Sequence, residues 1–498
     1  MQLHLFALAA ILIIRYQIKL LSYMEWGDES ETIVAAKMMA AGGILYSEIF
    51  NHHGPLTFLP GFLLEKVGDF GIQAHRTLIA VLQWIAFICL YLSPVLKKEG
   101  VRSLYTIIAA STVIMFLPEI FGHMYKYQVI AGIFIVIVLS QYTLPAIINP
   151  ASINTTRLAI GNILVASLPF LAITFLPAAG LLLIAAIRRC YFIKSLFWLS
   201  IGLTLNLLFL IFAGSLPGYL AYHIYLNSKI LPIYIGVQSY WQLIYTAFTF
   251  VTNNISSFII LIGIVSTTAT LVIRSTEQTY WRAILVALAI GSFLIRGDGF
   301  QALPFYYACI ALPLVYFSKK TEASRQEIVF WVGLAALCLV KLSLLLPIDK
   351  DRINSQKIPK STEFAELAKS LTNKEDKIIA YSFQNFQYIA ANRLPASGHF
   401  FYLPWQEKYN ENPKFNIKID ACQEIKANKP KIMLIDKWKV WGIYPWESYA
   451  NCVQKLIDEN YLQVPDKPYY IRKDIATVDI GTGLPQESYP MRPSQPYK

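Results

Sequence analysis

The stretch YQVIAGIFIVIVLSQYTLP, residues 127–145, contains no charged side chain. A helix needs about 20 mostly apolar residues to cross a membrane, and this stretch is close to that length. Residues 158–187 form a longer apolar run interrupted by Pro169 and Pro177, which predicts a tight hairpin of two short spans. Comparable apolar runs lie near residues 3–21, 76–96, 103–118, 195–214, 253–273, 283–295, 302–317 and 327–347. Together they predict about 11 transmembrane helices.

The charged residues divide the chain into two parts. Only 15% of the 498 residues are charged, whereas a soluble chain has about 25%. Residues 349–498 hold 22 of the 43 Lys+Arg and 18 of the 31 Asp+Glu, which leaves 34 charges in the first 348 residues. We therefore predict a polytopic α-helical membrane domain over residues 1–348 and a soluble α/β domain over residues 349–498.

In the C-terminal part, two stretches are helix-like and two are strand-like. The helix-like stretches are 361–371 and 446–460, and the strand-like stretches are 377–381 and 431–436. Its tryptophans could stack on sugars, but core packing or anchoring at the membrane interface is the commoner role of such residues. We expect the segment after Asp474, which is rich in Pro and Gly, to be a loose end.

The positions of Lys and Arg in short loops predict the orientation. With a cytoplasmic N-terminus, the cytoplasmic loops carry Lys97, Lys98, Arg102, Arg157, Arg188, Arg189, Lys194, Arg274, Arg282, Lys319, Lys320 and Arg325. The outer side then carries Glu25, Asp28, Glu29, Glu31, Glu48, Glu65, Asp69, Glu119 and Asp298. This arrangement requires that the short apolar run 55–67 lies on the membrane surface, within one outer loop over residues 22–75. The C-terminal domain is then extracytoplasmic, in a multi-pass protein of the inner membrane.

Several classes of protein and site are disfavoured. The formal charge is +12, but no basic stripe with interleaved aromatic residues indicates nucleic-acid binding. No Gly-rich loop indicates a nucleotide, and no Cys or His spacing indicates a metal, so the sequence predicts no metal ligands and no certain cofactor. Cys422 and Cys452 lie in the C-terminal part, where an oxidising compartment permits a disulfide, although spacing alone leaves their pairing open.

An acidic cluster follows the first apolar run. Asp28, Glu29 and Glu31 precede a helix-like segment that stops at Gly42 and Gly43. Acidic residues at a helix start can simply complement the helix dipole. A functional interpretation is the alternative, because other polar residues are expected on the same outer side.

Those other residues come from separate loops. Glu119, His123 and Lys126 follow the third apolar run, and Arg296-Gly-Asp298-Gly-Phe-Gln301 joins two later ones. His52 and His53 lie in the first outer loop. Each residue taken singly is explained by snorkelling or by loop solvation. Because ionisable groups at a membrane border are costly unless they are solvated or paired, their convergence indicates an anion-binding and acid/base pocket.

The outer loop also resembles a known family. The Trp26-Gly-Asp28-Glu29 step, the Gly42-Gly43-Ile-Leu-Tyr46 turn and the His53-Gly-Pro55-Leu56 step are similar to the first outer loop of GT-C fold glycosyltransferases. The resemblance is closest to the branch of protein O-mannosyltransferases and lipid A aminoarabinose transferases, glycosyltransferase family 39-like. In the family's His-Pro-Pro-Leu-like step, Gly54 replaces the first proline here. The segment from Arg296 to Tyr307 resembles the later loop that meets the lipid phosphate.

The resemblance implies an inverting transfer of a sugar from a polyprenyl-phosphate carrier to an extracytoplasmic lipid, glycan or protein. It implies that Asp28 is the general base towards the acceptor hydroxyl and that Glu29 supports it, with Glu119 as a second acidic residue. Cationic or neutral donors would stabilise the leaving phosphate. The candidates for that role are Arg296, Lys126, His123, His53, Gln301 and Tyr306.

Two other functions remain open from the sequence. A transporter or flippase typically has paired broken helices and charges within its spans, whereas this chain has a single Pro-interrupted hairpin. An O-antigen polymerase or ligase also has many spans, but its large outer loop is expected between later ones. The position of the Asp28-Glu29 pair directly after the first span favours the glycosyltransferase.

Overall fold

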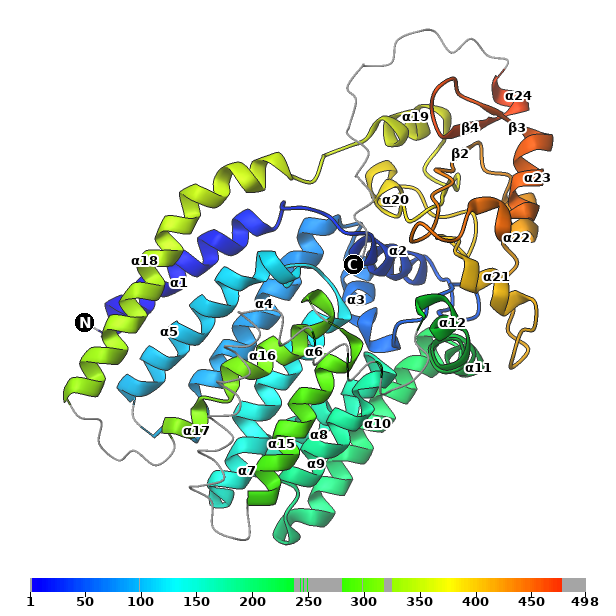
Figure 1. Cartoon of the computed structure of the whole chain (residues 1–498). Coiled ribbons are helices and arrows are strands. Elements are labelled where there is room, and N and C mark those ends of the chain that lie inside the picture. The colour runs from blue at the N-terminus through cyan, green and yellow to red at the C-terminus, as the bar shows by residue number, and fades with distance from the viewer. Residues whose placement is uncertain are drawn as a thin grey trace.

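The structure is a computed structural model, and it describes residues 2–97, 99–236, 242, 245, 249, 280–297, 299–317 and 325–476. Its apolar part is a bundle of helices (Figure 1). These are α1 (Gln2–Leu20), α4 (Ile72–Tyr91), α5 (Glu99–Phe116), α6 (Tyr127–Val138), α7 (Leu144–Ile148), α8 (Thr155–Ser167), α9 (Leu176–Ala186), α10 (Phe192–Ala213), α15 (Tyr280–Ser292), α16 (Leu303–Ala311), α17 (Leu314–Phe317) and α18 (Arg325–Ser355). The predicted span 253–273 lies outside the described residues.

Five helical stretches among the described residues are long and apolar enough to cross a membrane. They are Ile72–Tyr91, Gly100–Ile120, Tyr127–Ile148, Arg189–Ala213 and Val329–Leu346. On α10, Ile193 and Phe212 are 80% and 84% exposed, and water does not tolerate a long apolar surface of this kind. The bundle is therefore that of a multi-pass membrane protein, whereas the number of 11 spans stays a prediction.

Prolines break two of the apolar stretches. The predicted division of 158–187 into two helices is confirmed, because α8 ends at Ser167 and α9 begins at Leu176, with Pro169 and Pro177 in the intervening turns. A π-helical turn, Leu139–Thr143, joins α6 to α7 just before Pro145. At the other end of the bundle, α18 continues past residue 348, the predicted domain boundary, as far as Ser355.

The outer loop 22–75 contains two helices, α2 (Gly27–Ala40) and α3 (Leu59–Val67). A 3-10 turn, Pro55–Thr57, precedes α3, so the run 55–67 is two short pieces divided at Phe58. At Gly54 a Cβ atom would lie 2.1 Å from the carbonyl oxygen of Phe170. Glycine is therefore required at this step, and the substitution of the first proline has a steric cause.

After α10 the chain forms short outer helices and then, beyond α18, the C-terminal part. The outer pieces are α11 (Leu216–Gly218), a π-helical segment η8 (Tyr219–Ile230) and α12 (Leu231–Ile235). The C-terminal elements are α19 (Glu363–Leu371), β1 (Ile379–Ala380), α20 (Phe386–Ala391), α21 (Pro404–Asn410), α22 (Ala421–Asn428), β2 (Ile432–Leu434), α23 (Asn451–Asn460), β3 (Tyr461–Gln463), β4 (Tyr469–Arg472) and α24 (Lys473–Ala476). All four predicted elements of this part are present, within a few residues of the expected bounds.

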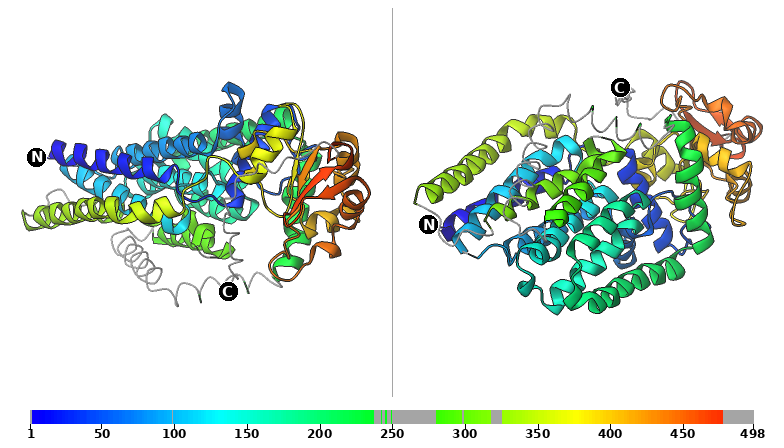
Figure 2. Two further views of the ribbon diagram at one scale, coloured as in Figure 1. Left: turned by 90° about the horizontal axis from the view of Figure 1, so that it is seen from above. Right: turned by 60° about the horizontal axis from the view of Figure 1, so that its bottom comes forward.

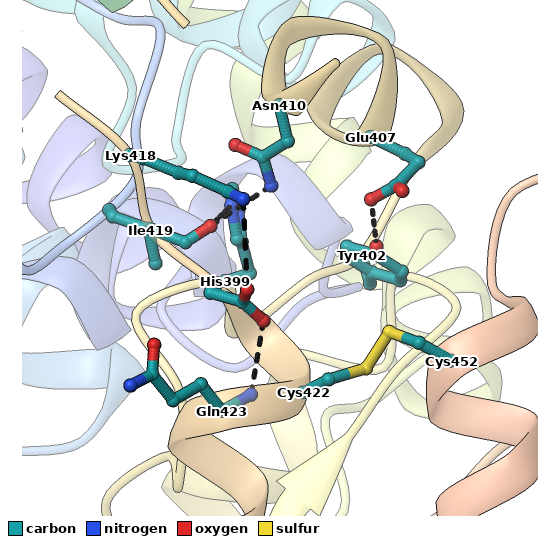
Figure 3. Close-up of a disulfide and its surroundings, with 10 residues drawn as sticks. His399, Tyr402, Glu407, Asn410, Lys418, Ile419, Cys422, Gln423 and Cys452 are labelled. Atoms are coloured by element: carbon teal, nitrogen blue, oxygen red, sulfur yellow. Dashed lines mark hydrogen bonds and ion pairs between the residues drawn. A yellow bond between two sulfur atoms is a disulfide. The ribbon is translucent and has the colours of Figure 1, made fainter. Parts of the chain in front are cut away.

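The C-terminal strands form one mixed sheet in the order β1-β2-β4-β3. Strand β1 runs parallel to β2, with Ile379 opposite Met433, and the other pairings are antiparallel. A disulfide between Cys422 and Cys452 joins α22 to α23 (Figure 3), with the two Cα atoms 6.2 Å apart. The pairing that the sequence left open is therefore present.

The C-terminal part packs on the outer loop and on η8 through one continuous apolar core (Figure 2). The Phe50 ring lies 4.8 Å from that of Tyr222 and 5.6 Å from that of Phe401, and Tyr222 in turn lies 4.8 Å from Tyr409. The backbone N–H of Phe50 donates to the carbonyl of Gly398 at 3.0 Å. This shared core fixes the loop that carries the candidate site residues.

Candidate functional site

The first turn of α2 presents Asp28 to a buried lysine. Lys126 Nζ donates to Asp28 Oδ2 at 3.1 Å. The lysine side chain is 1% exposed and that of Asp28 is 22% exposed. Lys126 directly precedes α6, so the N-terminal ends of α2 and α6 meet at this pair. Helix N-termini and an ammonium group both attract anions, and Asp28 remains reachable.

Three aromatic rings surround the lysine. Lys126 Nζ lies 3.7 Å from the centre of the Phe300 ring and 6.0 Å from that of Phe121. Trp26, which precedes α2, stacks on Phe121 with ring centres 5.7 Å apart. A cation over aromatic faces is stabilised without the loss of its positive charge. The rings therefore hold a charged Lys126 in a position next to Asp28.

Glu29 has a different environment from its neighbour. Both of its carboxylate oxygens accept from Arg76 of α4, with Nε–Oε1 at 2.8 Å, and both side chains are fully buried. The backbone N–H of Tyr125 donates to Glu29 Oε1 at 2.9 Å. Arg76 also donates to the backbone carbonyls at the end of α1, including that of Leu20 at 3.1 Å. Glu29 thus joins α2 to α4 and positions Asp28, and its contacts give it no direct access to a substrate.

Glu31 lies one turn further along α2 and is also buried. Asn51 Nδ2 donates to Glu31 Oε1 at 2.9 Å, and His53 Nδ1 lies 3.5 Å from the same oxygen. Burial, reinforced by the negative charge of Asp28, raises the pKa of Glu31 well above its usual value. Asp28 and Glu31 are therefore a reachable carboxylate and a buried acid on one helix face.

A chain of contacts extends from His53 to the later outer loop. The His53 ring lies 4.8 Å from the ring of Tyr127. Tyr127 Oη donates to Gln301 Oε1 at 3.3 Å, and Gln128 Nε2 donates to the same oxygen at 3.2 Å. The structure therefore brings Asp28, Lys126, His53 and Gln301 of the predicted site into one region, which also contains a Gln128 donor.

Other predicted residues have different surroundings. His123 is 5% exposed, and its Nε2 lies 3.2 Å from the Tyr23 carbonyl oxygen. Burial, helped by Arg76, lowers the pKa of His123 well below its usual value, so at neutral pH the ring is a hydrogen-bonding group without positive charge. The side chain of Glu119 is 55% exposed and pairs with Arg352 of α18 at 2.6 Å. The contacts of these two residues lead to α1 and α18.

The later loop is described in part. Arg296 ends the 3-10 turn Phe293–Arg296, and its side chain lies outside the described part of the chain, as does all of Asp298. Tyr306 on α16 is 8% exposed, and its ring packs 5.2 Å from that of Phe116 in the apolar core. The roles of Arg296 and Tyr306 at a phosphate stay predictions.

Sequence reasoning missed several partners of the acidic cluster. Arg76 begins a predicted span, and a charged residue at the first position of an apolar run beside an acidic loop was a usable signal. Asn51, Tyr127 and Phe300 gave no such signal, because their proximity arises from tertiary packing. Glu31, His52 and His53 place their ligand atoms within 4.8 Å of one another, so this trio is the group of described residues that could hold a metal ion.

Comparison with known proteins gives a loose structural likeness. No family model and no curated protein matches the chain. The archaeal oligosaccharyltransferase AglB from Archaeoglobus fulgidus, in complex with an inhibitory peptide and a dolichol-phosphate, superposes with a TM-score of 0.46 and 10% identity over 96% of this chain and 75% of that one. The same enzyme tethered to an acceptor peptide gives a TM-score of 0.44 and 12% identity over 95% and 74%. Likeness at this level carries no argument about activity.

Proposed function

We propose that the chain is an integral membrane glycosyltransferase that moves a sugar from a polyprenyl-phosphate carrier to an extracytoplasmic lipid, glycan or protein. The observation that carries the proposal is the Asp28–Lys126 pair, in which a reachable carboxylate lies 3.1 Å from a buried ammonium group. The motif resemblance of the first outer loop supports the same class of enzyme. The five membrane-length helices account for a lipid-linked donor.

The reaction assigns one task to each member of the pair. The acceptor hydroxyl oxygen attacks the anomeric carbon while the carbon–oxygen bond to the phosphate breaks, and its electron pair leaves with polyprenyl phosphate. The hydroxyl proton passes to the Asp28 carboxylate, which acts as general base. Lys126 places positive charge where negative charge develops on the leaving phosphate. Attack from the face opposite the phosphate inverts the anomeric centre.

The surrounding groups orient this pair. Glu29, held by Arg76, fixes the first turn of α2, and the aromatic rings hold Lys126. Gln301 and Gln128 are neutral donors near the same region, and Arg296 follows a few residues before Gln301. These contacts suit positioning and charge stabilisation, which a transferase site needs before any covalent chemistry.

Complementation of a deletion strain tests the proposal even where the acceptor is unidentified. We expect Asp28→Asn to lower formation of the envelope glycan that the deletion abolishes by about a hundredfold or more, because the general base is lost. Mass spectrometry of envelope glycans measures the product, and the unconsumed polyprenyl-phosphate sugar should accumulate.

Asp69→Asn is the matched control, because Asp69 lies in the same outer loop but pairs with Lys37 and is 56% exposed. It should restore the glycan fully. Complete restoration by Asp28→Asn, at a normal protein level, would exclude Asp28 as the base. Sugar carrier trapped on the cytoplasmic face of the deletion strain would instead indicate a transporter.

A further inference from the structure

We propose that Glu31, His52 and His53 form a binding site for one Zn²⁺ ion beside the Asp28–Lys126 pair. The ligand atoms of the three side chains lie within 4.8 Å of one another. The proposal is independent of the proposed function, since it concerns occupancy of the site and not transfer of a sugar. It also departs from the sequence prediction, which found no metal-ligand spacing because these residues meet only through folding.

The distances are close to those of a tetrahedral zinc site. Bonds of about 2.0–2.1 Å from Zn²⁺ to nitrogen or oxygen place neighbouring ligand atoms roughly 3.4 Å apart. His53 Nδ1 and Glu31 Oε1 lie 3.5 Å apart. The rings of His52 and His53 have their centres 4.4 Å apart, so a small rotation of the His52 ring completes the set. Three protein ligands leave a fourth position for water.

The charges around α2 favour a cation at this place. Glu29 is matched by Arg76 and Asp28 by Lys126. Glu31 is 1% exposed, and among the described residues its ion-pair contact is His53, with no Lys or Arg within 4.0 Å. A buried carboxylate is stable when it is paired or coordinates a metal. A divalent cation would replace the proton on this carboxyl and supply the missing positive charge.

The loop that carries the histidines is held by further side chains. Asn51 donates to Glu31 and accepts from the His53 N–H at 2.9 Å, so it orients two of the three ligands. Asn227 Nδ2 donates to the His52 carbonyl at 2.7 Å, where the His223 ring is also in contact at 2.9 Å. Such outer contacts fix the ligand side chains in metal sites.

The ligand types select the ion. Two imidazoles and one carboxylate are a nitrogen-rich set, which suits Zn²⁺. Ca²⁺ and Mg²⁺ bind six or more oxygen ligands and find too few here. The geometry thus points to zinc as the resident ion.

The test uses the full chain in detergent, purified through a tag without histidine, stripped with a chelator and dialysed. We expect one equivalent of Zn²⁺ per chain by mass spectrometry of the metal. Glu31→Gln and His52→Asn should each weaken affinity by at least about tenfold, since loss of an outer-shell partner alone costs that much. His75→Gln is the control, because His75 lies 3.3 Å from Glu65 in another buried pair whose carboxylate already has Lys37.

Co²⁺ added to the stripped wild-type protein keeps the test decisive if a variant fails to fold. Intense visible absorption, typical of tetrahedral Co²⁺ and abolished by one equivalent of Zn²⁺, would support the site. Weak absorption typical of octahedral Co²⁺ would overturn the proposal. Zinc content equal in wild type and in folded Glu31→Gln would also overturn it.

Discussion

Three carboxylates within one helical turn of α2 have three different environments. Asp28 is partly exposed beside Lys126, Glu29 is enclosed with Arg76, and Glu31 is buried beside His53. The sequence predicts the acidic cluster but not this division, because the partners come from other helices and loops. Burial and the charge of each partner therefore separate a candidate base from a positioning group and a candidate ligand.

The buried Glu29–Arg76 pair gives a prediction at the same scale. Arg76→Met should lower the free energy of unfolding by about 3–5 kcal/mol, because it leaves a buried carboxylate without its cation. Denaturant unfolding in detergent measures the change. Arg352→Met is the control, since its partner Glu119 is 55% exposed, and its loss should cost under about 1 kcal/mol. Equal effects of the two variants would contradict a buried anchor at Glu29.

Among the elements, the contact between the outer loop and residues 396–402 decides where the candidate site lies. Gly398 approaches the outer loop so closely that a Cβ atom would lie 2.0 Å from the Glu48 carbonyl oxygen. Sequence patterns predict helices and strands one at a time, so this approach could not be predicted from them. Hairpin α8–α9 could be predicted, because its prolines act on the local backbone.

Gly398→Ala should separate the two segments. We expect a loss of about 1–3 kcal/mol in stability, the usual cost of an overpacked core position, together with reduced activity in the complementation assay. Gly333→Ala in α18 is the control, because a Cβ there meets no atom within 4 Å and alanine favours a helix. An unchanged unfolding midpoint in Gly398→Ala would show that the contact is not tight.

His399 in the same segment gives a pH prediction. Burial lowers the pKa of His399 to about 3, and its neutral ring donates to the Ile419 carbonyl at 2.9 Å (Figure 3). The unfolded chain binds this proton below about 6.5, so the contribution of His399 to stability falls as pH drops from 6.5 towards 3.

His399→Gln should therefore reduce the loss of thermal stability between pH 6.5 and 4, measured by scanning fluorimetry. Glu424 has the opposite sign, because burial raises its pKa, and it is unchanged in both proteins. A steeper acid dependence in His399→Gln than in wild type would contradict a buried neutral ring.

For the whole molecule, charge distribution and apolar runs were sufficient to predict a helical membrane part followed by a small α/β part. They were not sufficient to predict that the two parts share a core, because that core joins Phe50 and Tyr222 to Phe401 across the chain. The side of the membrane on which this core lies is the remaining prediction at this scale.

Labelling of intact spheroplasts with a membrane-impermeant maleimide tests that side. Glu411→Cys, at a position 57% exposed in the C-terminal part, should be labelled directly. The native Cys190, exposed between α9 and α10, should be labelled only after permeabilisation. Mass spectrometry locates the label, and modification of Cys190 in intact spheroplasts would reverse the predicted topology.

The shared core also affects how the chain is made. In the predicted topology, Phe50 is translocated long before Phe401 is synthesised, and the interval is on the order of tens of seconds at usual translation rates. During that time the apolar side chains of the outer loop have no partner on the far side of the membrane. The nascent protein therefore depends on the translocation machinery, a chaperone or the lipid surface to shield this loop until translation ends.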